Sequence, residues 1–190
     1  MPTIEEPTTE PVDANATCEA IVNGWNGRPT LRTEVETESR AYYRPSTDTV
    51  HLPARFRFVD TAHFYATLFH ELVHSTGHES RLNRTFGARF GDELYSKEEL
   101  VAEMGAAFLC AIAEIANDQT DRNTTAYIQN WISKLEEDNR LIVYAAANAQ
   151  KAADSILGST FEEETEEDAA NLVALQTPMR AAAAEVAASL

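Results

Sequence analysis

Cysteine is scarce in this 190-residue chain, and long runs of apolar residues are missing. The two cysteines are Cys18 and Cys110, and Cys110 lies in an apolar run where a free thiol behaves as a small hydrophobic side chain. This usage does not indicate a disulfide framework. No segment approaches the roughly 18 apolar residues that a membrane-spanning helix needs. The sequence therefore predicts neither a disulfide-stabilised scaffold nor a membrane protein.

Basic residues are also in deficit, because 31 acidic residues face 15 lysines and arginines and leave a formal net charge of −16. Proteins bind nucleic acid largely by neutralising phosphates with Lys and Arg. Direct DNA binding is therefore not expected. An acidic excess of this size fits a high-salt source and also fits imitation of DNA by the protein surface. Composition does not decide between these two interpretations.

The two ends of the chain differ in composition from its centre. Residues 1–11 contain three glutamates and lack the basic and apolar regions of a secretory signal, so we expect a soluble, cytoplasmic protein. Residues 1–14, rich in Pro, Thr and Glu, predict a disordered acidic leader. Residues 159–190 contain the run FEEETEEDAA and predict an acidic, Ala-rich tail that can form a short helix. One domain is expected over residues 15–158.

Within this domain a short helix is expected over residues 15–25, and the hydrophobic pattern after it changes its period once. Apolar residues first alternate with polar ones, which predicts two or three short strands near residues 31–35, 42–43 and 50–52. Beyond Arg57 the period becomes about 3.6, and helices are expected over the approximate ranges 61–76, 96–116, 125–137 and 140–157. The predicted fold class is α+β, with a small N-terminal antiparallel sheet packed on a helical core.

The motif HELVH at residues 70–74 carries the clearest chemical signal. Positions four apart share one face of a helix, so His70 and His74 are expected to share one divalent metal ion, for which zinc fits best. Glu71 is expected to act as a general base on metal-bound water rather than as a ligand. The alternative is a pair of histidines without a metal. The surrounding apolar stripe favours the metal, because buried imidazoles need a partner.

The third metal ligand must come from outside this motif. The extended motif HExxHxxGxxH would place a histidine three residues after Gly77, but that position is Ser80. His78 is interpreted as a helix-end residue, with a place near the metal as the alternative. Glu99 and Glu103 lie four apart on the next predicted helix, so one can bind the metal while the other orients a ligating histidine.

Two interpretations of Glu99 remain open. The run EELVAE resembles the ExxSD pattern of thermolysin-like enzymes, and this resemblance implies Glu99 as the ligand and Glu103 as the residue that contacts a histidine. Alternatively, Ser96 and Glu99 form a capping box at the start of the helix, which would keep Glu99 away from the metal.

A metallopeptidase also needs a hydrogen-bond donor for the oxyanion of its tetrahedral intermediate. Tyr95, one turn before the glutamates, is the first candidate for this catalytic role, and Tyr65 is the second. Tyrosines at such positions are more often core residues, which is the alternative interpretation.

The segment from residue 41 to about residue 158 resembles the C-terminal metallopeptidase domain of ArdC-type antirestriction proteins, which occur on conjugative plasmids and in phages. The stretches that carry the resemblance are AYYRPSTDTVHLP, FYATLFHELVHSTGHESRLNR, FGDELYSKEELVAEMGAAFLC and YIQNWISKLEEDNRLIVYAAANAQKAADSILG. The resemblance implies a zincin-like fold, a zinc ion bound by His70, His74 and an acidic residue of EELVAE, and Glu71 as the catalytic base.

ArdC proteins carry a domain for single-stranded DNA ahead of this one. The residues that precede the matching segment here are too few and too acidic for such a domain, so we expect the peptidase part to stand alone. The first functional hypothesis is a zinc peptidase that hydrolyses a host defence or regulatory protein. The second is a non-proteolytic antirestriction protein that blocks a restriction enzyme by imitating DNA, with a structural zinc ion.

Overall fold

The computed structural model describes residues 13–35, 39–85, 93–115 and 140–159. The chain divides into two compact units, Met1–Ser159 and Thr160–Leu190, and the second lies outside the described residues. The helix expected over residues 125–137 and nearly all of the predicted leader and tail also lie outside them. Among the helices in the described ranges, none is long and apolar enough to cross a membrane.

The described α-helices are α1 (Ala16–Gly24), α2 (Thr61–Thr76), α3 (Glu93–Ile112) and α5 (Arg140–Leu157). Asn15 and Asp60 cap α1 and α2, because each side chain accepts a hydrogen bond from a backbone amide in the first turn. The helix that carries HELVH begins after Asp60 and ends at Gly77, as predicted. By contrast, α3 begins three residues before its predicted start at residue 96.

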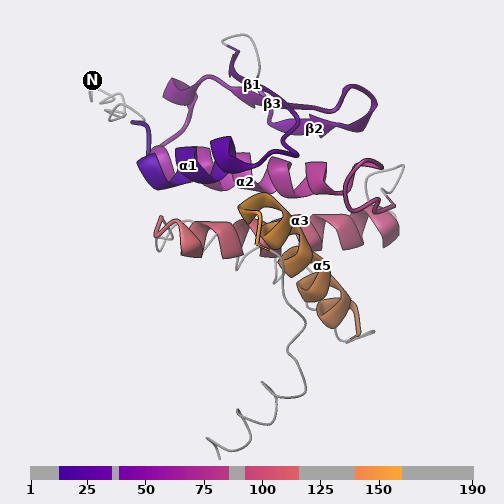
Figure 1. The fold of residues 1–190 in the computed structure, drawn as a ribbon. Helices are drawn as coiled ribbons and strands as arrows, with labels where there is room; N and C mark the ends of the chain where they lie inside the picture. Colours follow the sequence, from indigo (N-terminus) through magenta and orange to yellow (C-terminus); the bar gives the residue numbers. More distant parts are fainter. Residues whose placement is uncertain (1–12, 36–38, 86–92, 116–139, 160–190) are drawn as a thin grey trace, which may run out of the picture. The chain divides into compact units, whose positions relative to one another are not determined.

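A three-stranded sheet precedes the long helices and consists of β1 (Thr30–Val35), β2 (Tyr42–Arg44) and β3 (Thr49–Pro53). β3 lies in the middle, parallel to β1 and antiparallel to β2 (Figure 1). The α+β prediction is confirmed, but the prediction of an antiparallel sheet is wrong, because the sheet is mixed. Each strand reverses the direction of the preceding one. β3 lies between β1 and β2 in the sheet. Because β3 runs antiparallel to β2, it is parallel to β1.

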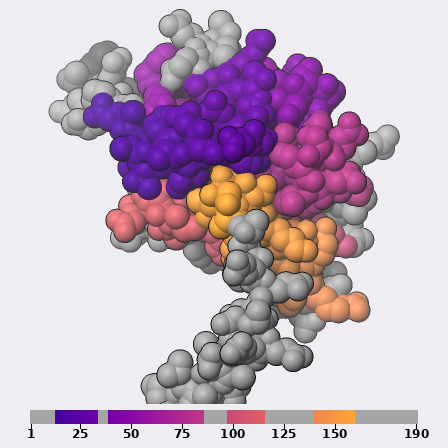
Figure 2. All heavy atoms as spheres, in the orientation of Figure 1, coloured from indigo at the N-terminus to yellow at the C-terminus, as the bar shows by residue number. Residues whose placement is uncertain are grey.

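The central element of the fold is α2, which lies between the sheet and the other long helices (Figure 1). It contacts β2 and β3 on one side and α3 and α5 on the other. Its buried apolar side chains spread over a broad arc of about half of the helix, wider than a single packing stripe, which fits packing against more than one layer; they are Phe64, Tyr65, Leu68, Phe69, Leu72 and Val73. α5 also packs against α1, and Figure 2 shows these segments as adjoining orange and indigo surfaces.

Arg81, in the loop after α2, holds the β2–β3 turn in place. Its guanidinium bonds to both carboxylate oxygens of Asp48 and donates to the carbonyl of Gly27 at 3.1 Å and to the hydroxyl of Tyr43 at 3.3 Å. Asp48 has a left-handed backbone conformation with a φ of 46°. Arg81 therefore links the loop after α2 to the strand that packs on this helix.

We expect acidification to destabilise the wild-type protein more than the Asp48→Asn variant. Hydrogen bonds from Arg81 outweigh partial burial and lower the pKa of Asp48. The stabilisation by Asp48 is thus complete above the unfolded-state pKa of about 4 and is lost as the pH falls through the lower folded-state value. Asparagine tolerates the left-handed backbone but does not titrate. Urea denaturation at about pH 6, 4 and 3 measures the difference, and parallel losses in the two proteins would contradict it.

Gly105 of α3 packs tightly against Val73 of α2. A Cβ atom at this position would lie 2.8 and 2.9 Å from the two methyl carbons of Val73. We expect Gly105→Ala to reduce the free energy of unfolding by about 1–3 kcal/mol, because overpacking outweighs the higher helix propensity of alanine. In a Val73→Ala background the same substitution should be neutral or stabilising. Denaturant unfolding of the four proteins of this cycle measures the coupling, and equal losses in both backgrounds would refute the contact as the cause.

Candidate metal centre

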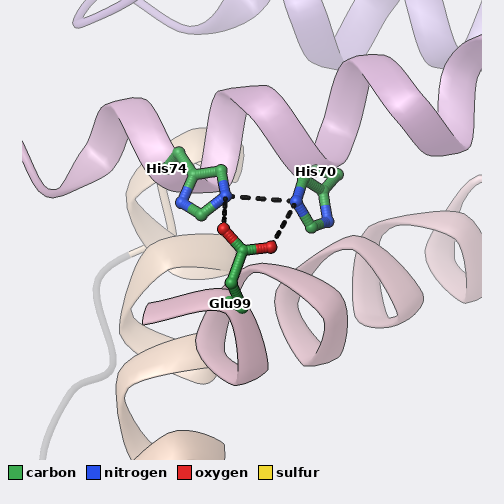
Figure 3. Close-up of side chains that lie close together, drawn as sticks. All are labelled: His70, His74 and Glu99. Carbon is green, nitrogen blue, oxygen red and sulfur yellow. Dashed lines mark hydrogen bonds and ion pairs between the residues drawn. The ribbon is translucent and has the colours of Figure 1, made fainter. Parts of the chain in front are cut away.

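The centre forms where one face of α2 meets α3 (Figure 3). His70 and His74 lie one turn apart on α2, and their Nε2 atoms are 3.1 Å apart. The carboxylate of Glu99 on α3 lies below them, with one oxygen 3.7 Å from Nε2 of His70 and the other 3.5 Å from Nε2 of His74. The three side chains are mostly buried, with 12–18% of their surface exposed.

These three side chains fit a divalent metal ion. One ligand atom from each lies within 4.8 Å of the others. Tetrahedral ligands about 2.0–2.1 Å from a zinc ion are separated by roughly 3.4 Å, which is close to the observed distances. Each histidine turns the same nitrogen toward the shared point, so one ion can be reached by both rings and the carboxylate.

The other ring nitrogens of the two histidines face separate carboxylates. Glu103 lies 3.4 Å from Nδ1 of His70, and Glu98 lies 3.3 Å from Nδ1 of His74. A carboxylate at Nδ1 fixes a proton on that nitrogen and leaves the Nε2 lone pair for a metal. Glu99 therefore offers a possible ligand atom, whereas Glu103 contacts the opposite ring nitrogen of His70.

The capping-box interpretation of Ser96 and Glu99 is wrong. It requires Ser96 to precede the helix, whereas α3 already begins at Glu93. The Glu99 side chain instead faces the two histidines. The sequence pattern was ambiguous because a Ser followed by a Glu three residues later also occurs inside helices.

Sequence reasoning missed Glu98 and Arg84. Glu98 is buried, with 6% of its surface exposed, and the guanidinium of Arg84 donates to both of its carboxylate oxygens. Despite burial, hydrogen bonds from Arg84 and His74 lower the pKa of Glu98. Arg84 lies in the loop after α2, and helical spacing gives no indication of its partner. A buried anion beside a histidine is recognisable only once the loop is folded.

Glu71 lies next to the ligand group and is also buried, with 8% of its surface exposed. Burial raises the pKa of Glu71 to about 7, although the charge of His74 and a hydrogen bond from the backbone amide of Tyr43 oppose this effect. Tyr43 belongs to β2, which is an edge strand among the described strands. Glu71 thus lies between the histidine pair and the sheet edge.

Burial and neighbouring charges set the pKa values of the other groups at the centre. For His74, hydrogen bonds to Glu98 and Glu99 outweigh burial and raise the pKa to about 10, so a metal that binds this ring displaces a proton. Burial, together with the nearby His74, lowers the pKa of His70 to about 3, so this ring is neutral at neutral pH. A neutral imidazole is the form that ligates a metal. The pKa of Glu103 rises to about 7 because of burial and the negative charge of Glu99.

The remaining candidates stand outside this group. Tyr95 lies in the first turns of α3, where the structure does not describe the side chain, so its role stays a prediction. The hydroxyl of Tyr65 donates to Glu19 at 2.6 Å and is therefore committed to the core rather than to the centre. The ring of His78 bonds to the hydroxyl of Ser80 at 2.8 Å, which agrees with its interpretation as a helix-end residue.

Comparison with known proteins gives consistent matches. A family model described as zincin-like metallopeptidase, MPTase-PolyVal, matches residues 28–148. The Mn(II)-bound crystal structure of the antirestriction protein ArdC from plasmid R388 is 38% identical with a TM-score of 0.63, and the match covers 81% of this chain and 56% of that one. The metal-free ArdC structure is 39% identical with a TM-score of 0.60, covering 85% and 53% of the two chains.

A curated relative is the DNA primase TraC of Escherichia coli, which is 46% identical over 118 residues. That match covers 62% of this chain but 11% of TraC. The chain therefore spans about half of ArdC and about a tenth of TraC.

The matches and the geometry agree on the centre. An ArdC structure binds Mn(II), and this chain brings two histidines and a glutamate to one point, so it has a divalent metal site. The family model covers well over half of the sequence, including both helices that form the centre. The chain therefore belongs to the zincin-like metallopeptidase family MPTase-PolyVal.

Proposed function

We propose that the protein is a zinc-dependent metallopeptidase in which His70, His74 and Glu99 bind the metal and Glu71 is the general base. The observation that carries this proposal is the position of Glu71, buried between the histidine pair and the edge of the sheet. A bound zinc ion would lower the pKa of a coordinated water toward about 7 and polarise the substrate carbonyl. Glu71 takes the proton of the attacking water and transfers it to the leaving amine.

The sheet edge supports a peptide as the substrate. The amide of Tyr43 donates to Glu71, so the outer side of β2 is turned toward the centre. An extended peptide can add to such an edge through main-chain hydrogen bonds, and this would place its carbonyl near Glu71. Tyr95 remains the proposed donor to the oxyanion, since it precedes Glu99 by four residues on α3. Glu103 holds His70 in its ligating orientation.

We propose that the biological substrate is a host defence or regulatory protein in the cytoplasm of a cell that receives a plasmid or phage. The support is the similarity to ArdC, an antirestriction protein of plasmid R388. A protein substrate also agrees with the charge of −16, because an acidic chain does not favour contact with DNA phosphates.

A second candidate function rests on the same charge. A surface this acidic can imitate DNA and occupy a restriction enzyme without any hydrolysis, with zinc in a structural role. The two functions predict different outcomes for Glu71→Ala in a restriction assay with the variant's fold and zinc content verified. A peptidase loses protection of incoming DNA, whereas a DNA mimic keeps it.

The substrate can be sought directly. Host lysates are incubated with the zinc-loaded protein or with Glu71→Ala, and new protein N-termini are identified by mass spectrometry. The peptidase proposal predicts a small set of N-termini that appear only with the wild type and disappear with a chelator. The same set of N-termini in both samples would refute it.

A further inference from the structure

We infer that Arg84 is a positioning residue that fixes the orientation of His74 through Glu98 and thereby sets the affinity for the metal. The inference rests on the proposed role of His74 as a ligand. The hydrogen bonds of Arg84 reach Glu98, Thr76 and Val73 rather than a proposed ligand, so it acts on His74 through Glu98. The residue lies in the loop between α2 and α3, outside both helices of the centre.

The first link of this relay is a buried, two-pronged ion pair. Nε of Arg84 donates to one oxygen of Glu98 at 2.9 Å, and an Nη atom donates to the other at 2.7 Å. The two side chains expose 5% and 7% of their surface. A planar guanidinium matches a carboxylate in this way, whereas a lysine offers a single point charge. Arg84 therefore fixes both the position and the plane of the Glu98 carboxylate.

The second link joins Glu98 to His74. The same Glu98 oxygen that accepts the 2.7 Å bond from Arg84 lies 3.3 Å from Nδ1 of His74. A proton on Nδ1 is thereby held toward Glu98, and Nε2 is turned toward His70 and Glu99. Any rotation of the Glu98 carboxylate would release the ring of His74.

Arg84 is itself fixed to the end of α2. It donates to the hydroxyl of Thr76 at 2.6 Å and to the carbonyl of Val73 at 2.8 Å. The loop folds back to allow this, because the amide of Arg84 bonds to the carbonyl of Gly77 at 3.0 Å and Asn83 adopts a left-handed φ of 49°. Val73 and Thr76 flank His74 in the chain, so one guanidinium holds both the backbone around His74 and the carboxylate behind its ring.

A purely structural role is the alternative, since the same contacts connect α2 to α3. Arg81 provides a matched control for it. Its side chain is also buried, bonds to both oxygens of a carboxylate, that of Asp48, and lies in the same loop. Arg81 also donates to the backbone carbonyl of Ser75, next to His74, but it bonds to no side chain of the metal centre. Arg84→Lys and Arg81→Lys each keep the charge and remove the two-pronged geometry.

The test is the dissociation constant for zinc, measured by competition with a chromophoric chelator, together with the visible spectrum of the Co²⁺-loaded protein. We expect Arg84→Lys to weaken zinc binding about 10–100-fold and to change the Co²⁺ bands. Arg81→Lys should lower the melting temperature with the zinc affinity unchanged. Glu98→Gln, which keeps the shape of the side chain, should weaken zinc binding similarly, and Arg84→Lys should add little to it.

Different results overturn different claims. Wild-type affinity in Arg84→Lys and in Glu98→Gln would refute the relay while leaving the metallopeptidase proposal intact. The relay would also be refuted if Arg84→Lys and Arg81→Lys both lose zinc affinity in proportion to their loss of melting temperature. Failure of the wild-type chain to bind zinc would overturn the proposed function and the relay together. If Arg84→Lys does not fold, Glu98→Gln still tests the second link, and wild-type zinc affinity in that variant refutes the relay.

Discussion

Substituting glutamine for Glu71 is expected to reduce kcat for peptide hydrolysis by about 10²–10⁴-fold and to leave the metal bound. Glutamine retains the shape of the side chain and an oxygen that can accept the amide hydrogen of Tyr43, but it cannot take a proton from water. Glu71 is also outside the ligand group, so its charge is not needed to hold the ion. Steady-state kinetics on a peptide from the lysate experiment, with zinc content determined in parallel, measures both effects.

Glu19→Gln is the matched control for this variant. Glu19 also accepts hydrogen bonds in a partly buried network, from Tyr65 at 2.6 Å and Arg55 at 2.7 Å, but it lies on α1 and outside the metal centre. Its replacement should lower stability and leave kcat within about twofold of the wild type. Wild-type kcat in Glu71→Gln would exclude Glu71 as the base. Loss of zinc together with activity would assign Glu71 a structural role instead.

Removing the metal is expected to lower the melting temperature by roughly 5–10 °C. Zinc at 100 times its dissociation constant stabilises the folded state by about 2.7 kcal/mol, and a chain of this size gains about 2–4 °C for each kcal/mol. Glu71, Glu99 and Glu103 lie close together in this mostly buried centre. A bound cation offsets the repulsion among their carboxylates, so the stability of the fold depends on it. Differential scanning calorimetry with zinc and with a chelator measures the shift.

The same measurement separates the two glutamates of α3. Glu99→Ala should lose the stabilisation by zinc, because a ligand is missing. Glu103→Ala should keep a reduced stabilisation, because its side chain contacts the ring of His70 rather than the shared point between the histidines. Stabilisation of Glu99→Ala by zinc at the wild-type level, with none in Glu103→Ala, would show that their roles are reversed.

The helix that carries HELVH was predictable because all of its determinants are local. A capping Asp60, an apolar face and a terminal Gly77 fix its limits, and the spacing of four residues alone brings His70 and His74 together. Glu99 could be named as a candidate for a related reason, since its helix is equally periodic. Its approach to the histidines, however, depends on close packing of two helices, which Gly105 permits at Val73.

The features that the sequence did not predict are set by distant contacts. Alternation of apolar residues indicates strands but not their order, so the parallel pairing of β1 with β3 was not predicted. Arg84 and Glu98 are 14 positions apart, and no helical or strand period links them. Their pairing follows from the path of a loop, with a left-handed Asn83 and backbone bonds to the end of α2.

The most direct test of the metal centre is a crystal structure of the zinc-loaded protein with anomalous diffraction recorded at the zinc absorption edge. The arrangement of α2 and α3 predicts one strong peak between the helices, bound by Nε2 of His70, Nε2 of His74 and a carboxylate oxygen of Glu99. A peak elsewhere in the chain, or a zinc ion at this point bound by Glu103 in place of Glu99, would contradict it.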